Sequence, residues 1–317
     1  PVIAAVPELA APAAPQPAPR VLSAAPQIDR EALEAQYHES QAQEALRELQ
    51  DALPSAVPPP AQGAWQGDLP RWQQHAVAAA EAGTRPMIAI VLDDVGVNRR
   101  GARRAIALPA PLTIAFMTYA EGLREMTTAA REAGHELMLH VPMQPMSEAM
   151  DPGPNVLRDD LLPAELVQRL AWGLDRYEGY VGINNHMGSR FTASREGMSL
   201  VMDELKARGL LFLDSLTAGN SVAGEMAALR GVPYAVRDVF LDNQPDDPAA
   251  IHRQLFLLEQ TARERGYAIG IGHPHDGTVD ALARWIPEMR ARGFALVPIS
   301  AIVRHRQRLA AQQAADG

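Results

Sequence analysis

The apolar run AIVLDDVG, residues 89–96, ends in two adjacent carboxylates, Asp93 and Asp94. Buried charge is costly unless it is paired or bound to a metal. The two acids therefore either lie in solvent at the end of a strand, or belong to a site where they do chemistry. Polar residues end other apolar runs in the same way: His140, Asn184, Asn185, His186, Asp214, Ser215, Asp242, His273 and His275.

Carboxylates and imidazoles that meet from separate strands are the ligands of hydrolytic metal sites, which need about three protein ligands and an open position for water. A single histidine at a strand end is more often structural, and Asp242 fits the start of the turn DNQPDD. Four of the nine histidines nevertheless fall at such ends. Their common position predicts one metal site with a nearby carboxylate as the proton acceptor.

The elements that must position these residues alternate along the chain. β-rich runs are expected at 87–92, 112–117, 136–141, 181–184, 211–214, 239–241, 268–272 and 295–298, and helices between most of them, at 99–108, 121–133, 163–177, 194–207, 249–265 and 279–292. This alternation predicts an α/β fold with a parallel sheet and right-handed crossovers. We expect an irregular (β/α) barrel of about seven parallel strands, with an open doubly wound sheet as the alternative.

A (β/α) barrel places its active site at the carboxyl ends of its strands, where the polar residues fall. Neighbouring residues of a strand normally point to opposite faces. Asp93 and Asp94 can therefore serve one site only if the backbone bends there, which Gly96 would permit.

Composition excludes several classes of protein. The formal net charge of -9 argues against a nucleic-acid binder. The absence of cysteine excludes disulfides, thiolate metal sites and a cysteine nucleophile. No apolar run reaches the roughly 18 residues of a membrane span. The chain starts at Pro1 rather than at a methionine, and we expect a targeting or anchoring segment upstream of it.

Four segments are expected from composition. Residues 1–27 form an Ala/Pro-rich linker, and residues 28–70 a stalk helix, over 28–53, followed by a Pro-rich linker. Residues 71–303 form the domain of alternating strands and helices that holds the polar strand ends, and residues 304–317 form a helical tail. An unstructured tail with a transient helix is the alternative for the stalk.

Several motifs resemble those of a known family. IAIVLDDVG is similar to the first motif of the polysaccharide deacetylases, and AGHELMLHVPMQP to their second. Together with GINNHMGSRFT, FLDSLT and GIGHPHDGT, they resemble the divergent polysaccharide deacetylase branch of the NodB-like superfamily. The resemblance covers about residues 70–300 and implies a metal-dependent amide hydrolase that removes N-acetyl or related acyl groups from an envelope glycan.

The resemblance also implies roles for individual residues. Asp93 matches the general base, Asp94 the metal-binding aspartate and His140 the first metal-binding histidine. Asp214 matches the aspartate that orients the catalytic acid, and His273 matches that acid. The bound ion would be divalent, with Zn²⁺ expected.

The sequence departs from the family pattern at two places. Gln144 stands where the second metal-binding histidine is usual, and NNHMGS replaces the usual third motif with its arginine. We expect His186 to supply the missing imidazole. Asn184, Asn185, Gln144 and His275 are then candidates for binding substrate, and His275 is a second candidate for the acid or for the metal.

The resemblance implies a bacterial location in the periplasm or at the outer face of the inner membrane. The partners expected are a glycan substrate, an envelope protein bound through residues 28–53, and a membrane tether upstream of residue 1. A non-catalytic glycan-binding or scaffold protein on the same fold is the alternative function. A dinucleotide enzyme is disfavoured because GIGHPHDG holds only a partial glycine motif, and a serine hydrolase because no GxSxG elbow is present.

Overall fold

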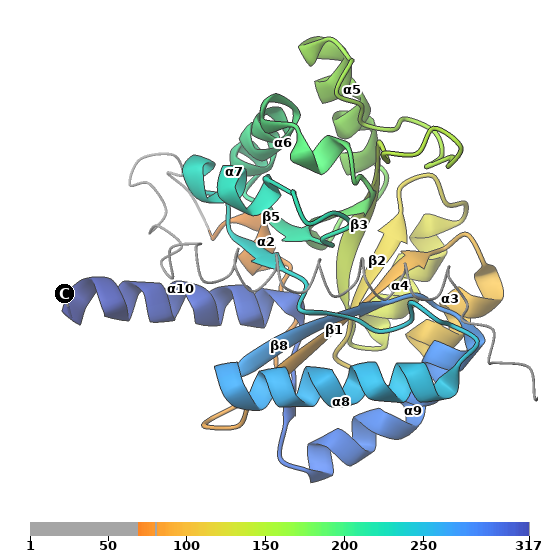
Figure 1. Ribbon diagram of the computed structural model, residues 1–317, viewed down its shortest axis with the longest axis vertical. Helices are drawn as coiled ribbons and strands as arrows, with labels where there is room; N and C mark the ends of the chain where they lie inside the picture. The colour runs from red at the N-terminus through yellow and green to blue at the C-terminus, as the bar shows by residue number, and fades with distance from the viewer. Residues whose placement is uncertain (1–68, 80, 317) are drawn as a thin grey trace, which may run out of the picture. The chain divides into compact units, whose positions relative to one another are not determined.

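The computed structural model describes residues 69–79 and 81–316 (Figure 1). Within these ranges nine parallel strands form one sheet in the order β6-β5-β4-β3-β2-β1-β8-β7, and β9 pairs with β1. The strands are β1 (Met87–Val95), β2 (Thr113–Met117), β3 (Glu136–Met143), β4 (Tyr180–Met187), β5 (Leu211–Asp214), β6 (Tyr234–Val236), β7 (Val239–Phe240), β8 (Tyr267–Gly272) and β9 (Ala295–Leu296). The predicted first linker and stalk helix lie outside the described residues, and so does the second linker up to residue 68.

The predicted fold class, an irregular (β/α) barrel, is confirmed. Seven of the described strands have three or more residues, and β7 and β9 have two each. The strand order ends at β6 on one side and β7 on the other, and within the described residues no ladder joins these two strands. The sheet is therefore a curved, open barrel.

Helices connect most of the strands and pack against the sheet (Figure 1). The described helices are α2 (Arg71–Gln74), α3 (Arg99–Ile106), α4 (Leu123–Glu132), α5 (Pro163–Leu174), the 3₁₀ turn η1 (Phe191–Ala193), α6 (Arg195–Arg208), α7 (Ala223–Arg230), α8 (Pro248–Arg265), α9 (Asp276–Ala291) and α10 (Ile299–Asp316). The sequence did not predict α7 or β6, which are short. The predicted tail helix begins earlier than residue 304, since α10 starts at Ile299.

The two faces of the sheet carry two separate cores. In β1, Ile88, Ile90 and Leu92 pack beneath the helices, in a cluster that includes residues of α3, α4, α6, α8 and α9. Ala89 and Val91 alternate with them and join the cluster on the concave face. Because of this alternation, a polar residue at the end of a strand reaches the barrel interior only if it occupies one of the positions that face the concave side.

Trp72 closes the amino end of the concave core. Its side chain is 1% exposed and packs in the same cluster as Ile299 and Ile302, at the start of α10. Its backbone N–H donates to the carbonyl of Gly209, just before β5, at 2.9 Å. The short segment around α2 is therefore part of the domain and fills the end opposite the carboxyl ends of the strands.

We expect Trp72→Ala to lower the free energy of unfolding by about 3–5 kcal/mol, because it removes a large buried aromatic side chain from a core that cannot fully collapse. Denaturant-induced unfolding measures the change. Gln73→Ala, in the same short helix, is the control and is expected to cost about 1 kcal/mol or less. Equal effects of the two substitutions would contradict the assignment of Trp72 to the core.

The Gly134-His135-Glu136 sequence of the second motif serves the fold. Glu136 is fully buried, and its carboxylate accepts hydrogen bonds from Ser300 N at 3.1 Å, from the Ser300 hydroxyl, and from Val77 N at 3.3 Å. Burial raises the pKa of this carboxyl, and the hydrogen bonds oppose the rise. Glu136 thus ties the segment before β1 and the start of α10 to β3, at the amino end of the barrel.

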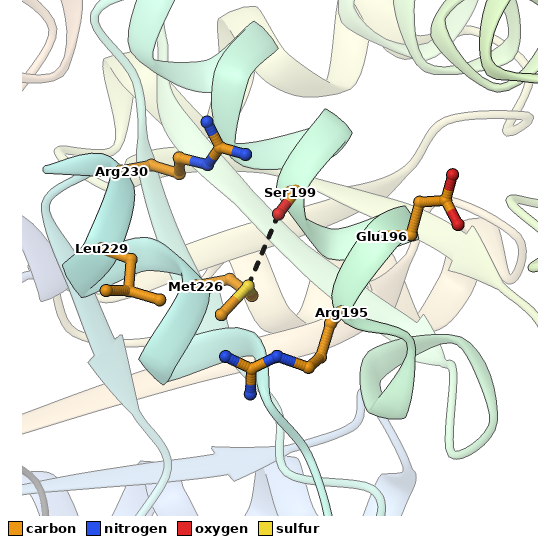
Figure 2. A pocket seen from close by; sticks show the side chains of 6 residues that line it. All are labelled: Arg195, Glu196, Ser199, Met226, Leu229 and Arg230. Carbon is orange, nitrogen blue, oxygen red and sulfur yellow. Dashed lines mark hydrogen bonds between the residues drawn. The ribbon is translucent and has the colours of Figure 1, made fainter.

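Two further observations concern the surface. Among the described residues, no helix is both long enough and apolar enough to span a bilayer. A shallow hollow lies between α6 and α7, lined by Arg195, Glu196, Ser199, Met226, Leu229 and Arg230 (Figure 2). Its lining comes from the helices, so this hollow is separate from the polar residues at the strand ends.

Candidate active site

A backbone irregularity in β1 brings both adjacent carboxylates to the concave face. The register between β1 and β2 shifts between Leu92 and Val95, and Asp94 has a φ of 52°. Leu92 and Val95 both pack on the helix-covered face. The two residues between them can therefore both turn to the other face, as the sequence required of Asp93 and Asp94. Non-glycine residues with positive φ are uncommon and gather at functional sites.

A second irregularity positions the imidazole of β4. The pairing of β3 with β4 shifts between Leu137 and Leu139, where one residue of β3, Met138, faces two of β4, Val181 and Gly182. Ile183 consequently packs under the helices, while Asn184 and His186 face the interior beside His140. Met187, which ends β4, has a φ of 52°.

Three predicted ligands converge on one point. Oδ1 of Asp94 lies 2.8 Å from Nδ1 of His186 and 3.2 Å from Nε2 of His140, and the two nitrogens are 3.3 Å apart. Ligand atoms about 2.0–2.1 Å from a tetrahedral ion lie about 3.3 Å from one another, so the spacing suits one divalent metal. His140 is buried, His186 and Asp94 partly so.

The carboxylate of Asp94 supplies an independent test of this fit. Its Oδ1 is buried and accepts no hydrogen bond of good geometry, although two imidazole nitrogens lie close to it. Buried polar atoms nearly always have a partner. A cation at the common point of the three groups would satisfy this oxygen, so the residues present fit a divalent metal.

The charges at these ligands reinforce one another. Burial opposes ionisation of Asp94, but the two imidazoles outweigh it and hold the pKa of this carboxyl well below its usual range. Burial disfavours the charged form of His140, but the carboxylates of Asp93 and Asp94 raise its pKa overall. The site is therefore built around ionised Asp94.

Asp93 lies beside the metal-type ligands in a different environment. Its side chain is almost wholly buried, and its Oδ2 lies 3.8 Å from Nε2 of His140. Burial raises the pKa of this carboxyl, and His140, His273 and a hydrogen bond from Asn184 oppose the rise. A carboxyl with a raised pKa is suited to accept a proton near neutral pH.

His273 faces the same centre from the end of β8. Its Nε2 lies 3.8 Å from Oδ2 of Asp94, and its Nδ1 donates to Oδ1 of Asp242 at 3.0 Å. Burial disfavours the charged imidazole, but the hydrogen bond and charge of Asp242 outweigh it and raise the pKa of His273 to about 9. His273 is therefore protonated at neutral pH, as a proton donor must be.

The aspartate that holds His273 is not the predicted one. Asp214 accepts hydrogen bonds from Ser221 Oγ at 2.7 Å and Leu216 N at 2.8 Å, and burial raises its pKa. The reason is parity: Leu213 faces the concave core, so Asp214 points to the opposite face. The prediction that Asp214 orients His273 is wrong, since Asp242 makes that contact.

Asp242 was interpreted from the sequence as the start of a turn. Its Oδ2 also accepts hydrogen bonds from the backbone N–H of His273 at 2.6 Å and from Thr278 Oγ1 at 2.7 Å. Burial raises the pKa of this carboxyl, but His273 lowers it more, so Asp242 remains ionised. Asp242 directly follows the predicted strand at 239–241. This position at the carboxyl end of a strand is the sequence signal that could have assigned it to the site.

The four residues predicted to bind substrate lie in different surroundings. Asn184 is fully buried and bonds to Asp93 and His140. Asn185 donates to Met187 O at 2.8 Å and accepts from Ser215 N at 2.8 Å. Gln144 accepts from Asp159 N at 3.0 Å and so holds the loop after β3. His275 is exposed, directly before α9, and its ring centroid lies 5.7 Å from that of His273.

The model of the divergent polysaccharide deacetylase family matches residues 90–303. The chain belongs to this family. The matched region begins within β1 and ends within α10, and so holds every residue of the site described above.

Relatives of this chain occur in Escherichia coli and Haemophilus influenzae. The uncharacterized protein YibQ of Escherichia coli K12 is 37% identical over 199 residues, which are 63% of this chain and 62% of YibQ. An uncharacterized protein of Haemophilus influenzae is 35% identical over 195 residues, 62% of this chain and 69% of that protein. The alignment with YibQ thus spans less than two thirds of YibQ.

A solved structure shares the fold. The crystal structure of the uncharacterized protein ATU2773 from Agrobacterium tumefaciens C58 superposes with a TM-score of 0.73 at 31% sequence identity. The superposition covers 75% of this chain and 97% of that one. The barrel described here therefore accounts for almost the whole of a related protein.

Proposed function

We propose that this chain is a metal-dependent hydrolase that removes N-acetyl or related acyl groups from an envelope glycan. One observation carries the proposal: three ligand atoms from Asp94, His140 and His186 converge on a point at which Asp94 Oδ1 has no hydrogen bond. A buried carboxyl, Asp93, lies 3.8 Å from Nε2 of His140, and the imidazole of His273 lies 3.8 Å from Oδ2 of Asp94.

The reaction that these groups support is hydrolysis of an amide. When bound, a divalent ion at Asp94, His140 and His186 would supply the positive charge that stabilises the oxyanion and acidifies the attacking water. Asp93 accepts the proton of that water as its oxygen bonds to the carbonyl carbon. The C–N bond then breaks, and His273 donates its Nε2 proton to the departing amine. The products are a free carboxylate and the amino sugar.

The sugar chain would lie along the loop that follows β3. A hollow of about 560 Å³ is lined there by Gln144, Pro145, Ser147, Glu148, Ala149, Met150, Asp151, Pro152, Gly153, Val156 and Arg158. Most of this lining comes from consecutive residues of one loop, which starts immediately after the strand that carries His140. Polar and acidic side chains in a hollow of this size suit the hydroxyl groups of a glycan.

We propose that the protein works in the bacterial periplasm or at the outer face of the inner membrane, where envelope glycans are accessible. Residues 28–53 would contact an envelope protein, and a tether upstream of residue 1 would hold the domain at the membrane. Family membership and the substrate class support this location. Fractionation of cells that produce the protein, followed by its detection in each fraction, tests it.

The metal content of the purified protein tests the proposed function most directly. Protein prepared without chelators is expected to hold close to one Zn²⁺ or similar ion per chain, and His186→Ala is expected to lose most of it, because only two ligands remain. Elemental analysis by mass spectrometry gives the ratio. Release of acetate from N-acetylated oligosaccharides measures the hydrolysis.

His252→Ala is the control, since His252 is exposed on α8 and is in neither of the two groups of side chains that could hold a metal, Asp94 with His140 and His186, or Asp242 with His273 and His275. It is expected to keep the metal. No metal in wild type even after addition of Zn²⁺ would contradict the proposed function and favour the alternative, a glycan-binding protein without catalysis on the same fold.

A further inference from the structure

Asn184 lies between the carboxyl of Asp93 and the imidazole of His140 and does not face solvent. Its side chain is fully buried within the barrel. Nδ2 donates to both oxygens of Asp93, at 2.9 and 3.0 Å, and Oδ1 lies 2.9 Å from Nδ1 of His140. One amide thus touches the carboxyl assigned as the base and an imidazole assigned to the metal.

The polarity of an amide determines what each neighbour can be. An amide oxygen only accepts and an amide nitrogen only donates. An ionised Asp93 only accepts, so Nδ2 must face it, and Oδ1 is then left for His140. Nδ1 of His140 must consequently carry a proton. The reversed amide would place its oxygen against two carboxylate oxygens and is excluded.

We propose that Asn184 is a positioning residue that fixes His140 with its proton on Nδ1 and its Nε2 lone pair toward Asp94 and His186, while it holds Asp93 in place as a hydrogen-bond acceptor. The proposal rests on the proposed function, because it assigns Asn184 to the metal ligand and the base. Partners that orient metal-binding imidazoles in this way typically change metal affinity or activity by 10–100-fold when they are removed.

The placement also explains why an asparagine follows the bulge in β4. Ser215 Oγ, after β5, accepts a further hydrogen bond from Nδ2 at 3.1 Å. Asn184 therefore joins β1, β3, β4 and the end of β5. Substrate cannot reach it, which separates its expected effect from that of a residue that binds the glycan.

Asn184→Ala and Asn185→Ala form a matched pair. Both residues are buried amides on β4, but the hydrogen bonds of the Asn185 side chain go to Met187 O, Thr217 Oγ1 and Ser215 N rather than to Asp93 or the three metal-type ligands. Titration of metal-free protein with Zn²⁺ is expected to show a Kd raised 10–100-fold for Asn184→Ala and less than 3-fold for Asn185→Ala. In the hydrolysis assay, Asn184→Ala is expected to lower kcat and leave KM unchanged.

Each outcome decides the role of Asn184. An unchanged Zn²⁺ affinity in Asn184→Ala, or an equal loss in both variants, would overturn the proposal, and so would an effect confined to KM. Thermal unfolding of both variants shows whether they fold. If Asn184→Ala does not fold, nuclear magnetic resonance of ¹⁵N-histidine-labelled wild type decides: a protonated, slowly exchanging Nδ1 on His140 supports the proposal, and an unprotonated Nδ1 overturns it.

The same spectrum separates this proposal from the proposed function. If wild type binds no Zn²⁺, the proposed function fails. The assignment of Asn184 is then judged on slow exchange of the Nδ1 proton of His140 in the metal-free protein, because slow exchange requires a hydrogen-bond acceptor at Nδ1. If wild type binds Zn²⁺ and hydrolyses nothing, the Zn²⁺ affinities of the two variants still test Asn184.

Discussion

Asp93→Asn is expected to lower kcat by about 10²–10⁴-fold while the protein keeps its Zn²⁺, since a positioned general base contributes a factor of this size. Asparagine has nearly the same shape as aspartate but cannot accept the proton of the attacking water. Asp93 is not among the three ligands that converge on one point, so metal content should stay near that of wild type. Acetate release and elemental analysis, on the same preparation, measure the two quantities.

Asp94→Asn is the matched comparison, because it changes the neighbouring residue in the same way. It removes the charge of a ligand whose Oδ1 lies 2.8 and 3.2 Å from two imidazole nitrogens. We expect it to lose both the metal and the activity. A deacetylation rate in Asp93→Asn equal to that of wild type would show that another group takes the proton.

The second large effect concerns the pH dependence of activity, through the proposed general acid His273. The pKa of His273 is raised to about 9, so the protonated form is present below that pH and is lost as the pH rises through it. The pKa of Asp93 is raised from its usual value, so the base form is lost as the pH falls through that raised value. Activity should therefore follow a bell-shaped pH profile, with the high-pH limb assigned to His273.

Asp242→Asn is expected to move that limb toward pH 6.5, the ordinary pKa of the imidazole, because it removes the charge that contributes most to the raised pKa of His273. An imidazole with the ordinary pKa is only about 3% protonated at pH 8, so a loss of up to about 30-fold is expected there and a much smaller one at pH 6. The pH dependence of kcat/KM measures the shift. Asp214→Asn is the control for the corrected assignment, and it should leave the high-pH limb where it is.

The sequence predicted the barrel and the position of the site because both depend on strong local patterns. Apolar runs that alternate with amphipathic helices specify a parallel sheet, and polar residues at the carboxyl ends of its strands must meet. Asp94, His140 and His186 come together as predicted. Their roles in metal binding and catalysis stay predictions until metal content and turnover are measured.

The sequence could not predict which face each terminal residue would choose. A bulge of one residue reverses the parity of everything that follows it. The irregularity in β1 lets Asp93 and Asp94 share a face, and the one in β4 turns Asn184 and His186 inward. No irregularity precedes Asp214 in β5, so alternation carries it outward, and the family pattern assigned it a role that Asp242 fills. Asn184 was predicted to bind substrate. The irregularity in β4 instead turns its side chain into the buried interior of the barrel.

The first described helix, α2, and the start of α10 lie at the amino ends of the strands. Trp72 and Ile299, the first residue of α10, pack together in the core at the amino end of the barrel. The predicted metal ligands and His273 lie at the carboxyl ends of the strands. An experimenter who immobilises the protein on a bead or sensor through the segment before α2 therefore attaches it by the side remote from the mouth. Large, insoluble glycan fragments can then be presented to the mouth in a binding or turnover assay without the support standing in their way.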